Sequence, residues 1–257
     1  MDLTPHNRYS RHTILEQIGE TGQARIEASH VLIVGLGGLG SPAALYLAAA
    51  GVGHLSFADF DTVETSNLQR QVAHTTARVG QLKTESARQA CLEINPACQI
   101  RTLDYALDRD DLDPLCAESS VVLDCTDNFD TRFAINAACV RHKVPLVSGA
   151  AIRFDGQISV FDTRQADAPC YRCLYSDADA PMDTCAQAGI LGPVVGLIGC
   201  AQAIETLKLI CAIGTSLAGR LVLFDGLSME WNEIRLRRHP QCPVCGVGTV
   251  STNSRTA

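Results

Sequence analysis

The chain lacks the long apolar runs that membrane-spanning and secreted proteins carry. Its longest uncharged apolar stretches, 39–53 and 189–201, are shorter than the roughly 20 residues that span a bilayer. The first 20 residues carry charges throughout and contain no apolar segment of the kind that a secretory signal needs. We therefore expect no transmembrane segment, no membrane partner and a location in the cytoplasm.

Basic residues are the minority charge. Lys and Arg total 21 against 28 Asp and Glu, a formal net charge of -7, which on average repels phosphate backbones and anionic lipids. No nucleic-acid partner is expected. Internal repeats and low-complexity tracts are also missing, and 46% of the 257 residues are apolar, so the chain can bury a substantial core.

Twelve cysteines are present, but without a secretory signal the reducing cytosol argues against disulfides. Four of them form two CxxC pairs, Cys170 with Cys173 and Cys242 with Cys245. Four thiolates suffice for one closed, tetrahedral zinc site of the structural type. The alternative is a redox dithiol, which normally lies near a first strand-to-helix turn. The pattern favours structural zinc.

Strand and helix patterns alternate after a helical segment over residues 1–30. Short apolar strands are predicted at 31–34, 54–59, 99–103, 120–124 and 144–148, and helices at 41–50, 84–94, 110–117 and 129–142. Such repeated units predict an α/β fold, a Rossmann-like doubly wound and mostly parallel sheet. Later strands in GQISVFDT, RLVLFD and NEIRLRR extend this sheet in antiparallel fashion. A long apolar helix is predicted near 190–213, and a disordered tail at 251–257.

A glycine-rich turn follows the first of these strands. In VLIVGLGGLG, Gly35, Gly37 and Gly40 satisfy GxGxxG between a strand and a helix. Small residues there let the backbone and the helix N-terminus approach a phosphate. Asp59 ends the next strand, at about the distance where an acidic residue reaches ribose hydroxyls. Alone, the motif favours NAD and also fits ATP, and a tight turn without a ligand is the remaining interpretation.

The segment DFDTVETSNLQRQ is not typical of a dehydrogenase. It places the carboxylates of Asp59 and Asp61 beside a polar loop. This loop contains Ser66, Asn67 and Arg70. Lys83 then opens the following helix, where a cation opposes the helix dipole unless an anion lies nearby. A polyphosphate is the predicted partner of these cations, and solvated surface charge is the alternative for Arg70 and Lys83.

Two further positions are candidates for chemistry. Asp127, in DCTDNFDTR, follows a strand and precedes a helix, at the sheet edge where doubly wound folds bind ligands. A carboxylate there can hold Mg²⁺ against phosphate oxygens, whereas helix capping by Asp127 or Thr126 is the alternative. Cys185, in the polar segment PMDTCAQAG, fits a nucleophile or sulfur acceptor and equally an idle thiol.

Eight motifs in order resemble one family: GLGGLGSP, DFDTVETSNLQRQ, VGQLKTESA, LDCTDN, GQISVF, CYRC, AGILGPVVGLIG and CPVCG. They resemble the bacterial MoeB/ThiF/HesA group of adenylyltransferases, which activate ubiquitin-like sulfur carrier proteins, from about residue 8 to residue 246. The resemblance implies that the C-terminal glycine carboxylate of a carrier attacks the α-phosphate of MgATP and expels pyrophosphate. A persulfide donor later converts the resulting acyl-adenylate to a thiocarboxylate.

The resemblance also implies roles for single residues. The ATP-binding residues would be Gly38, Asp59, Asp61, Ser66, Asn67, Arg70, Lys83, Asp127 and Asn128. The catalytic residues would be Arg11, Arg70, Lys83 and Asp127, with Asp127 at the magnesium. Arg11 matches an arginine that reaches into the partner subunit's site, which implies a homodimer. The four CxxC cysteines match zinc ligands, and Cys185 matches a crossover-loop cysteine that some relatives use in covalent carrier chemistry.

The implied layout is one ThiF-type adenylation domain over 1–250, with a helical segment 1–30, a nucleotide-binding part 31–150 and a carrier-binding and zinc part 151–250. The sequence ends soon after CPVCG, so no rhodanese domain is expected and sulfur comes from a separate donor.

Two branches of the family differ in pathway. The segment VPLVSGAAIRFDGQISVF resembles the MoeB branch, which acts in molybdenum-cofactor biosynthesis, and we prefer this assignment. PAALYLAAAGVG and AGILGPVVGLIG resemble the ThiF side, in thiamine biosynthesis, at least as much. An NAD-dependent dehydrogenase and a non-catalytic carrier-binding scaffold are the alternative functions.

Overall fold

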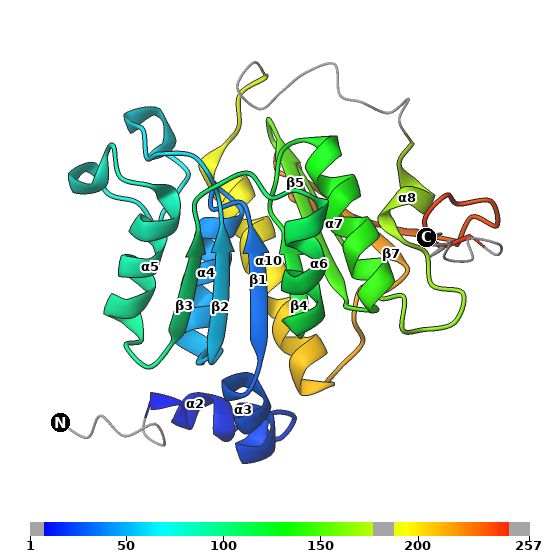
Figure 1. Ribbon diagram of the computed structural model, residues 1–257, viewed down its shortest axis with the longest axis horizontal. Helices are drawn as coiled ribbons and strands as arrows, with labels where there is room; N and C mark the ends of the chain where they lie inside the picture. Colours follow the sequence, from blue (N-terminus) through cyan, green and yellow to red (C-terminus); the bar gives the residue numbers. More distant parts are fainter. Residues whose placement is uncertain (1–7, 177–187, 247–257) are drawn as a thin grey trace, which may run out of the picture.

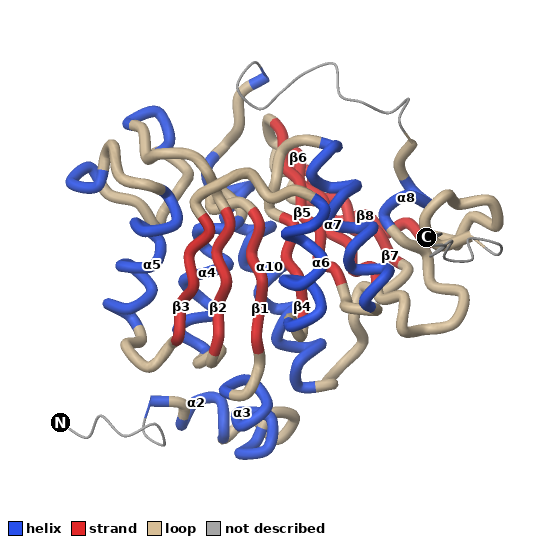
Figure 2. Tube along the Cα trace, in the orientation of Figure 1, coloured by secondary structure: helices blue, strands red, loops and turns tan. Residues whose placement is uncertain are grey.

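One sheet of eight strands organises the residues that the computed structural model describes, 8–176 and 188–246. Its order is β3-β2-β1-β4-β5-β6-β7-β8 (Figures 1 and 2). Pairings from β3 to β5 are parallel, and those from β5 to β8 are antiparallel. The strands are β1 (His30–Val34), β2 (His54–Ala58), β3 (Gln99–Leu103), β4 (Val121–Asp124), β5 (Leu146–Ile152), β6 (Asp155–Phe161), β7 (Arg220–Asp225) and β8 (Glu230–Arg235).

Helices cover both faces of this sheet. The helices are α2 (Ser10–Thr13), α3 (Gly19–Glu27), α4 (Gly40–Ala50), α5 (Lys83–Ile94), α6 (Arg109–Glu118), α7 (Phe129–His142), α8 (Tyr171–Leu174) and α10 (Gly192–Cys211), with short 3₁₀ turns at Thr65–Asn67 and Thr76–Arg78. One core packs α4, α5 and α10 against the strands, and a second packs α6 and α7 against the opposite face. The doubly wound prediction is therefore confirmed, including its antiparallel extension.

The strand order reverses between β1 and β4, which are neighbours although two strand–helix units separate them along the chain. β4 is wholly buried and β1 nearly so, which explains their unbroken apolar sequences. Ligands of doubly wound folds bind beyond the carboxyl ends of the strands at such a reversal. The sequence patterns predicted most boundaries to within two residues. β5 differs, because its hairpin with β6 extends it to Ile152.

Most of the apolar stretch 189–201 lies in the longer helix α10, which begins at Gly192. Among the described helices, α10 alone has the length and the apolar composition of a membrane span. Half of its most apolar window is buried inside the protein, where the helix packs on α4, β5 and β6. This packing is that of a core helix, although Ile204 remains 59% exposed. The predicted tail at 251–257 lies outside the described residues, as does Cys185.

Candidate functional site

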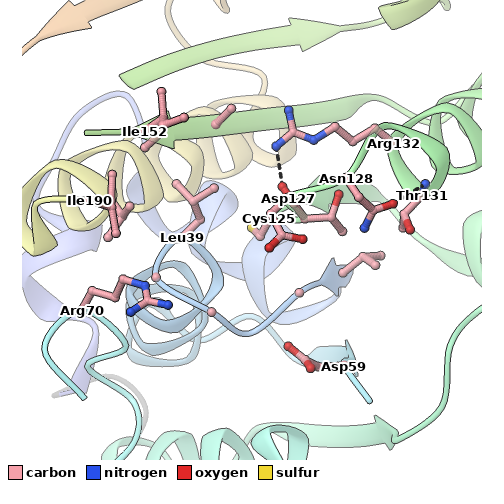
Figure 3. Close-up of a pocket in the computed structure, with 18 of the residues that line it drawn as sticks. Leu39, Asp59, Arg70, Cys125, Asp127, Asn128, Thr131, Arg132, Ile152 and Ile190 are labelled. Carbon is pink, nitrogen blue, oxygen red and sulfur yellow. Dashed lines mark hydrogen bonds between the residues drawn. The ribbon is translucent and has the colours of Figure 1, made fainter. Parts of the chain in front are cut away.

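A cavity of about 820 Å³ opens at the strand-order reversal. Its walls come from the glycine turn after β1, the segments after β2 and β4, the β5–β6 hairpin and the start of α10. Figure 3 shows Asp59, Arg70 and Asp127 around this space, each from a different segment. The cavity lies where a doubly wound fold is expected to bind its ligand.

The glycine turn allows close backbone contacts at the cavity floor. Gly35 has a φ of 90°, and a Cβ atom there would lie 2.7 Å from the carbonyl oxygen of Cys125. A Cβ on Gly40 would lie 1.9 Å from the carbonyl oxygen of Gly35. Both contacts involve backbone, which cannot move aside, so the turn requires glycine at these two positions. Gly38, the predicted nucleotide contact, lines the cavity.

The backbone of Leu36 holds the glycine turn in place. Its N–H donates to Asp59 Oδ2 at 2.7 Å, and its carbonyl oxygen lies 3.0 Å from His74 Nε2. Because a carbonyl only accepts, Nε2 carries the proton, and His74 Nδ1 accepts from the Ser86 hydroxyl at 2.9 Å. His74 is 5% exposed. Burial lowers its pKa, which favours the neutral ring, and the two hydrogen-bond partners select the tautomer.

Asp59 is part of the same arrangement. Its second oxygen accepts from the backbone N–H of Asp61 at 2.9 Å, so both oxygens already orient the turn. Burial raises the pKa of Asp59, against Lys83 and the two backbone donors, which lower it. Each carboxylate oxygen has a second lone pair, and the residue lines the cavity, so the predicted ribose contact is compatible with this geometry and stays a prediction.

Lys83 and Asp61 form an ion pair in the cavity wall. Lys83 Nζ lies 2.7 Å from Asp61 Oδ2, and the lysine side chain is only 8% exposed. The surface-charge alternative is therefore wrong for Lys83. Arg70 is half-buried, lines the cavity and donates to the Ser66 carbonyl oxygen at 3.1 Å. Both cations border one cavity, as a polyphosphate site requires.

Asn128, not Asp127 or Thr126, caps α7. The Asn128 side chain accepts from the Thr131 N–H at 2.9 Å, while the Thr126 hydroxyl donates to Asp124 at 2.7 Å. The capping alternative for Asp127 and Thr126 is therefore wrong. Asp127 is exposed and lines the cavity, which leaves its carboxylate accessible to a ligand or a cation.

The structure does not bring every predicted residue to the cavity. The Ser66 side chain donates to Glu64 at 3.0 Å and lies outside the lining, whereas Asn67 lines it and also accepts from the Glu64 N–H. Arg11 is exposed on α2, which lies below the sheet in Figure 1, at the opposite end from the cavity. Arg11 therefore cannot contact the cavity of its own chain.

Two buried polar residues that line the cavity, Gln71 and Arg132, were not predicted from the sequence. Gln71 is 3% exposed, and among the described residues its Oε1 has no hydrogen-bond partner. Arg132 is 7% exposed and donates to the carbonyl oxygen of Thr126, beside Asp127. Both follow closely on residues that were singled out, but a single sequence does not distinguish a buried amide or guanidinium from an exposed one.

The two CxxC pairs meet in space. Their four Sγ atoms lie within 4.8 Å of one another, with Cys170 to Cys242 at 3.6 Å and Cys173 to Cys245 at 3.4 Å. A tetrahedral zinc with Zn–S bonds of about 2.3 Å sets its sulfurs about 3.8 Å apart. A disulfide would need about 2.05 Å. The cluster thus fits zinc, and these two sulfur–sulfur contacts join different CxxC pairs, unlike the bond of a redox dithiol.

Comparison with known proteins shows the family of the chain. The model of the ThiF family matches residues 9–244. The chain belongs to the ThiF family.

Among curated relatives of this ThiF family chain is the molybdopterin-synthase adenylyltransferase of Escherichia coli (strain K12). It is 49% identical over 93% of this chain and 96% of its own length. The SAMP-activating enzyme E1 of Haloferax volcanii is 43% identical, over 98% of this chain and 93% of its own. A solved structure of Escherichia coli MccB has the same fold, with a TM-score of 0.82 at 22% identity, over 99% of this chain and 76% of its own.

Metal analysis of the purified protein should find about one zinc per chain with four thiolate ligands. Cys242→Ser should lower the zinc content, because three thiolates leave the site open. Cys91→Ser, at a buried cysteine outside the cluster, should keep the metal and serves as the control. Metal-free protein with a reversible Cys170–Cys173 disulfide would instead support the redox alternative.

His74→Gln should reduce the loss of stability that acid causes. Burial holds the pKa of His74 in the folded chain below the ordinary value of about 6.5. The unfolded chain therefore binds a proton first as the pH falls below about 6.5, and folding is weakened there. Urea unfolding at several pH values between about 5 and 8 should show a shallower decline for His74→Gln. His54→Gln, at an exposed histidine, is the control. Equal declines in all three proteins would contradict the assignment.

Proposed function

We propose that this ThiF family chain is an ATP-dependent adenylyltransferase that activates the C-terminal glycine carboxylate of a ubiquitin-like sulfur carrier protein. The observation that carries the proposal is one cavity bordered by the glycine turn, Arg70, Lys83 and Asp127. Relatives named as an adenylyltransferase and as an activating enzyme, at 49% and 43% identity, support the reaction class. The lengths of these relatives match that of the chain closely, so the proposal extends to the whole domain, 1–250.

In the proposed reaction, a carboxylate oxygen of the carrier attacks the α-phosphorus of ATP. The bond from the α-phosphorus to the bridging oxygen breaks, and pyrophosphate leaves with the electron pair. The chain's contribution is to position the reactants and to neutralise charge, which supply most of the catalysis in transfers at phosphorus. No side chain of the protein has to form a covalent bond in this step.

Each residue at the cavity has a task in this proposal. Gly38 and the turn approach the phosphates, and Asp59 holds the ribose. Arg70 and Lys83 neutralise the triphosphate, and a phosphate group offers Lys83 a second anionic partner beside Asp61. Further contacts come from Asn67 and Asn128, which both line the cavity. Asp127 holds Mg²⁺, which supplies charge neutralisation at the phosphate oxygens.

Molybdenum-cofactor biosynthesis is the pathway we propose, since the relative at 49% identity is named for molybdopterin synthase; thiamine biosynthesis is the second candidate. A separate persulfide donor supplies the sulfur, and the enzyme acts in the cytoplasm. Zinc at the four cysteines stabilises the part of the chain that binds the carrier. A role for Cys185 as a covalent acceptor stays a prediction.

A nicotinamide-dependent dehydrogenase is less well supported. It would use the glycine turn and Asp59, but it leaves the buried Lys83, Arg70 and Asp127 in the cavity wall without a function. A non-catalytic carrier-binding scaffold likewise leaves the accessible Asp127 carboxylate unexplained. The dehydrogenase predicts nicotinamide binding that does not depend on magnesium.

ATP–pyrophosphate exchange with purified carriers tests the proposed reaction. Exchange should require Mg²⁺ and a carrier that ends in glycine, and the carrier that supports the fastest exchange identifies the pathway. Asp127→Ala should lower exchange at least about 100-fold, since it removes a group that acts on developing charge. The free energy of unfolding should change by no more than about 0.5 kcal/mol, because Asp127 is exposed.

Asp130→Ala is the matched control for this variant. Asp130 is an exposed carboxylate in the first turn of α7 that does not line the cavity, so exchange should persist. Absence of exchange with every glycine-tailed carrier would refute the proposed function. Full exchange by Asp127→Ala would refute the role of that carboxylate.

A homodimer with shared sites forms part of the proposal. Helix α2, which carries Arg11, lies at the opposite end of the sheet from the cavity (Figure 1), so a catalytic Arg11 must act on a partner. The exposed apolar residues Tyr46 on α4 (60%), Ile204 on α10 (59%) and Ile14 after α2 (73%) are available to bury at such an interface.

Mixing two inactive variants tests whether the site is shared. Arg11→Ala and Asp127→Ala each impair every site of their own dimer. In a mixed dimer, one site combines an intact Asp127 with an intact Arg11 from the other chain. When equal amounts of the two variants exchange subunits at random, half of the dimers are mixed, and one of the two sites in each mixed dimer is intact. Exchange should therefore recover to about a quarter of the wild-type rate. No recovery from subunits that demonstrably exchange would show that Arg11 does not act across an interface.

A further inference from the structure

Helix α7 connects the cysteine cluster with the cavity. It carries Arg132 and Asn136, which are four residues apart and therefore lie on the same face of the helix. Both contact the segment 170–175, which contains two of the four clustered cysteines. Arg132 also contacts the loop that contains Asp127. One helix face thus touches both sites.

Asn136 holds the cysteine end of this connection. Its Oδ1 accepts from the backbone N–H of Tyr171 at 2.8 Å, and its Nδ2 donates to Cys170 Sγ at 3.7 Å. Asn136 is 1% exposed, so water does not compete for these bonds. Hydrogen bonds of this kind to a metal ligand orient the ligand. The position of Cys170 is therefore fixed relative to α7.

Arg132 holds the cavity end. Its guanidinium donates to the Tyr171 hydroxyl at 3.3 Å, to the carbonyl oxygen of Gly149 at 3.4 Å and to that of Thr126. Asp124, which is fully buried, balances the charge with an oxygen 3.9 Å from Nε. A buried guanidinium that loses one acceptor has no water to replace it. Movement of Tyr171 therefore has to move Arg132 or the loop that Arg132 holds.

The segment also forms part of the cavity wall. Only five residues after Cys170, Tyr175 lines the cavity. Its hydroxyl lies 2.8 Å from Gln157 Nε2, and Gln157 lines the cavity as well. The Tyr175 ring packs on Tyr171, with ring centres 4.8 Å apart. The cysteine cluster thus borders the cavity through a short, densely packed segment.

We infer that metal binding at the four cysteines and nucleotide binding in the cavity are coupled through Tyr171 and Arg132. In this arrangement Arg132 is a positioning residue that orients the loop 124–128. The inference rests on the proposed function only in taking MgATP as the cavity ligand. Coupling of two binding sites is reciprocal, so MgATP must raise the affinity for zinc by the factor by which zinc raises the affinity for MgATP.

Zinc affinity of the full chain, measured by equilibrium competition against a chelating dye, tests the coupling. In the wild type, saturating MgATP without any carrier should raise the zinc affinity about fivefold. Tyr171→Phe keeps the ring packing and all four cysteines but removes the hydroxyl that Arg132 contacts. It should still bind about one zinc and MgATP, and the factor should fall to about one.

Tyr9→Phe is the matched control. It removes another buried tyrosine hydroxyl, which accepts from Asn95 Nδ2 at 2.8 Å and contacts neither the cavity lining nor the four clustered cysteines. MgATP should raise the zinc affinity of this variant by the same factor as in the wild type. If the zinc-free chain simply unfolded, the two ligands would be coupled equally in all three proteins, and an equal factor in Tyr171→Phe would therefore overturn the inference.

Arg132→Lys gives a second measurement should Tyr171→Phe fail to fold. Lysine keeps the charge but cannot reach Tyr171 and Thr126 together, so kcat for exchange should fall more than about tenfold while KM for ATP changes little. An unchanged kcat would overturn the positioning role. If MgATP binds to the wild type without changing its zinc affinity, the coupling is refuted and the proposed function stands. If MgATP does not bind at all, both fail.

Discussion

The hydrogen bonds to the backbone of Leu36 are the constraint on which the candidate site depends. Asp59 accepts from the N–H of this residue, and its carbonyl oxygen accepts from both His74 and the Ser41 hydroxyl. Because Leu36 lies between Gly35 and Gly37, these bonds set the direction in which the turn presents its backbone to the cavity. The absence of side chains allows the turn to approach β4, and the hydrogen bonds hold it there. Glycine alone would leave the turn free to adopt other conformations.

Much of the fold was predictable because hydrophobic periodicity is a local signal. The strands around β1 and the helices after them followed from the apolar patterns, and the antiparallel extension followed from the change in pattern after Gly149. Pairing between side chains was not predictable in the same way. The partner of Lys83 is Asp61, 22 residues earlier, and one sequence does not identify such a partner. The capping alternative considered Thr126 and Asp127 but not Asn128, the actual cap, because all three are acceptable capping residues.

The cavity and the cysteine cluster are connected through one helix, α7, although their residues are far apart in the sequence. Sixty-eight residues separate the CxxC pairs along the chain, yet the four cysteines meet in one cluster. This cluster lies beside helix α7, whose first residues lie at the cavity. Arg132 was overlooked since charge is rarely buried, and the structure buries it with Asp124 as counter-charge. On the proposed coupling, a metal bound at the four cysteines would constrain the cavity wall and the loop 124–128 as well as the C-terminal segment.

The central claim is that the cavity directs a carboxylate to the α-phosphorus of ATP, and an isotope experiment tests it most directly. A carrier whose C-terminal carboxylate is enriched in the heavy oxygen isotope is incubated with the enzyme and MgATP, and the acyl-adenylate is then cleaved by a thiol. Attack at the α-phosphorus leaves the bridging oxygen on phosphorus, so the account predicts heavy oxygen in AMP. Heavy oxygen in inorganic phosphate together with ADP, or no transfer of label while ATP is consumed, would contradict it.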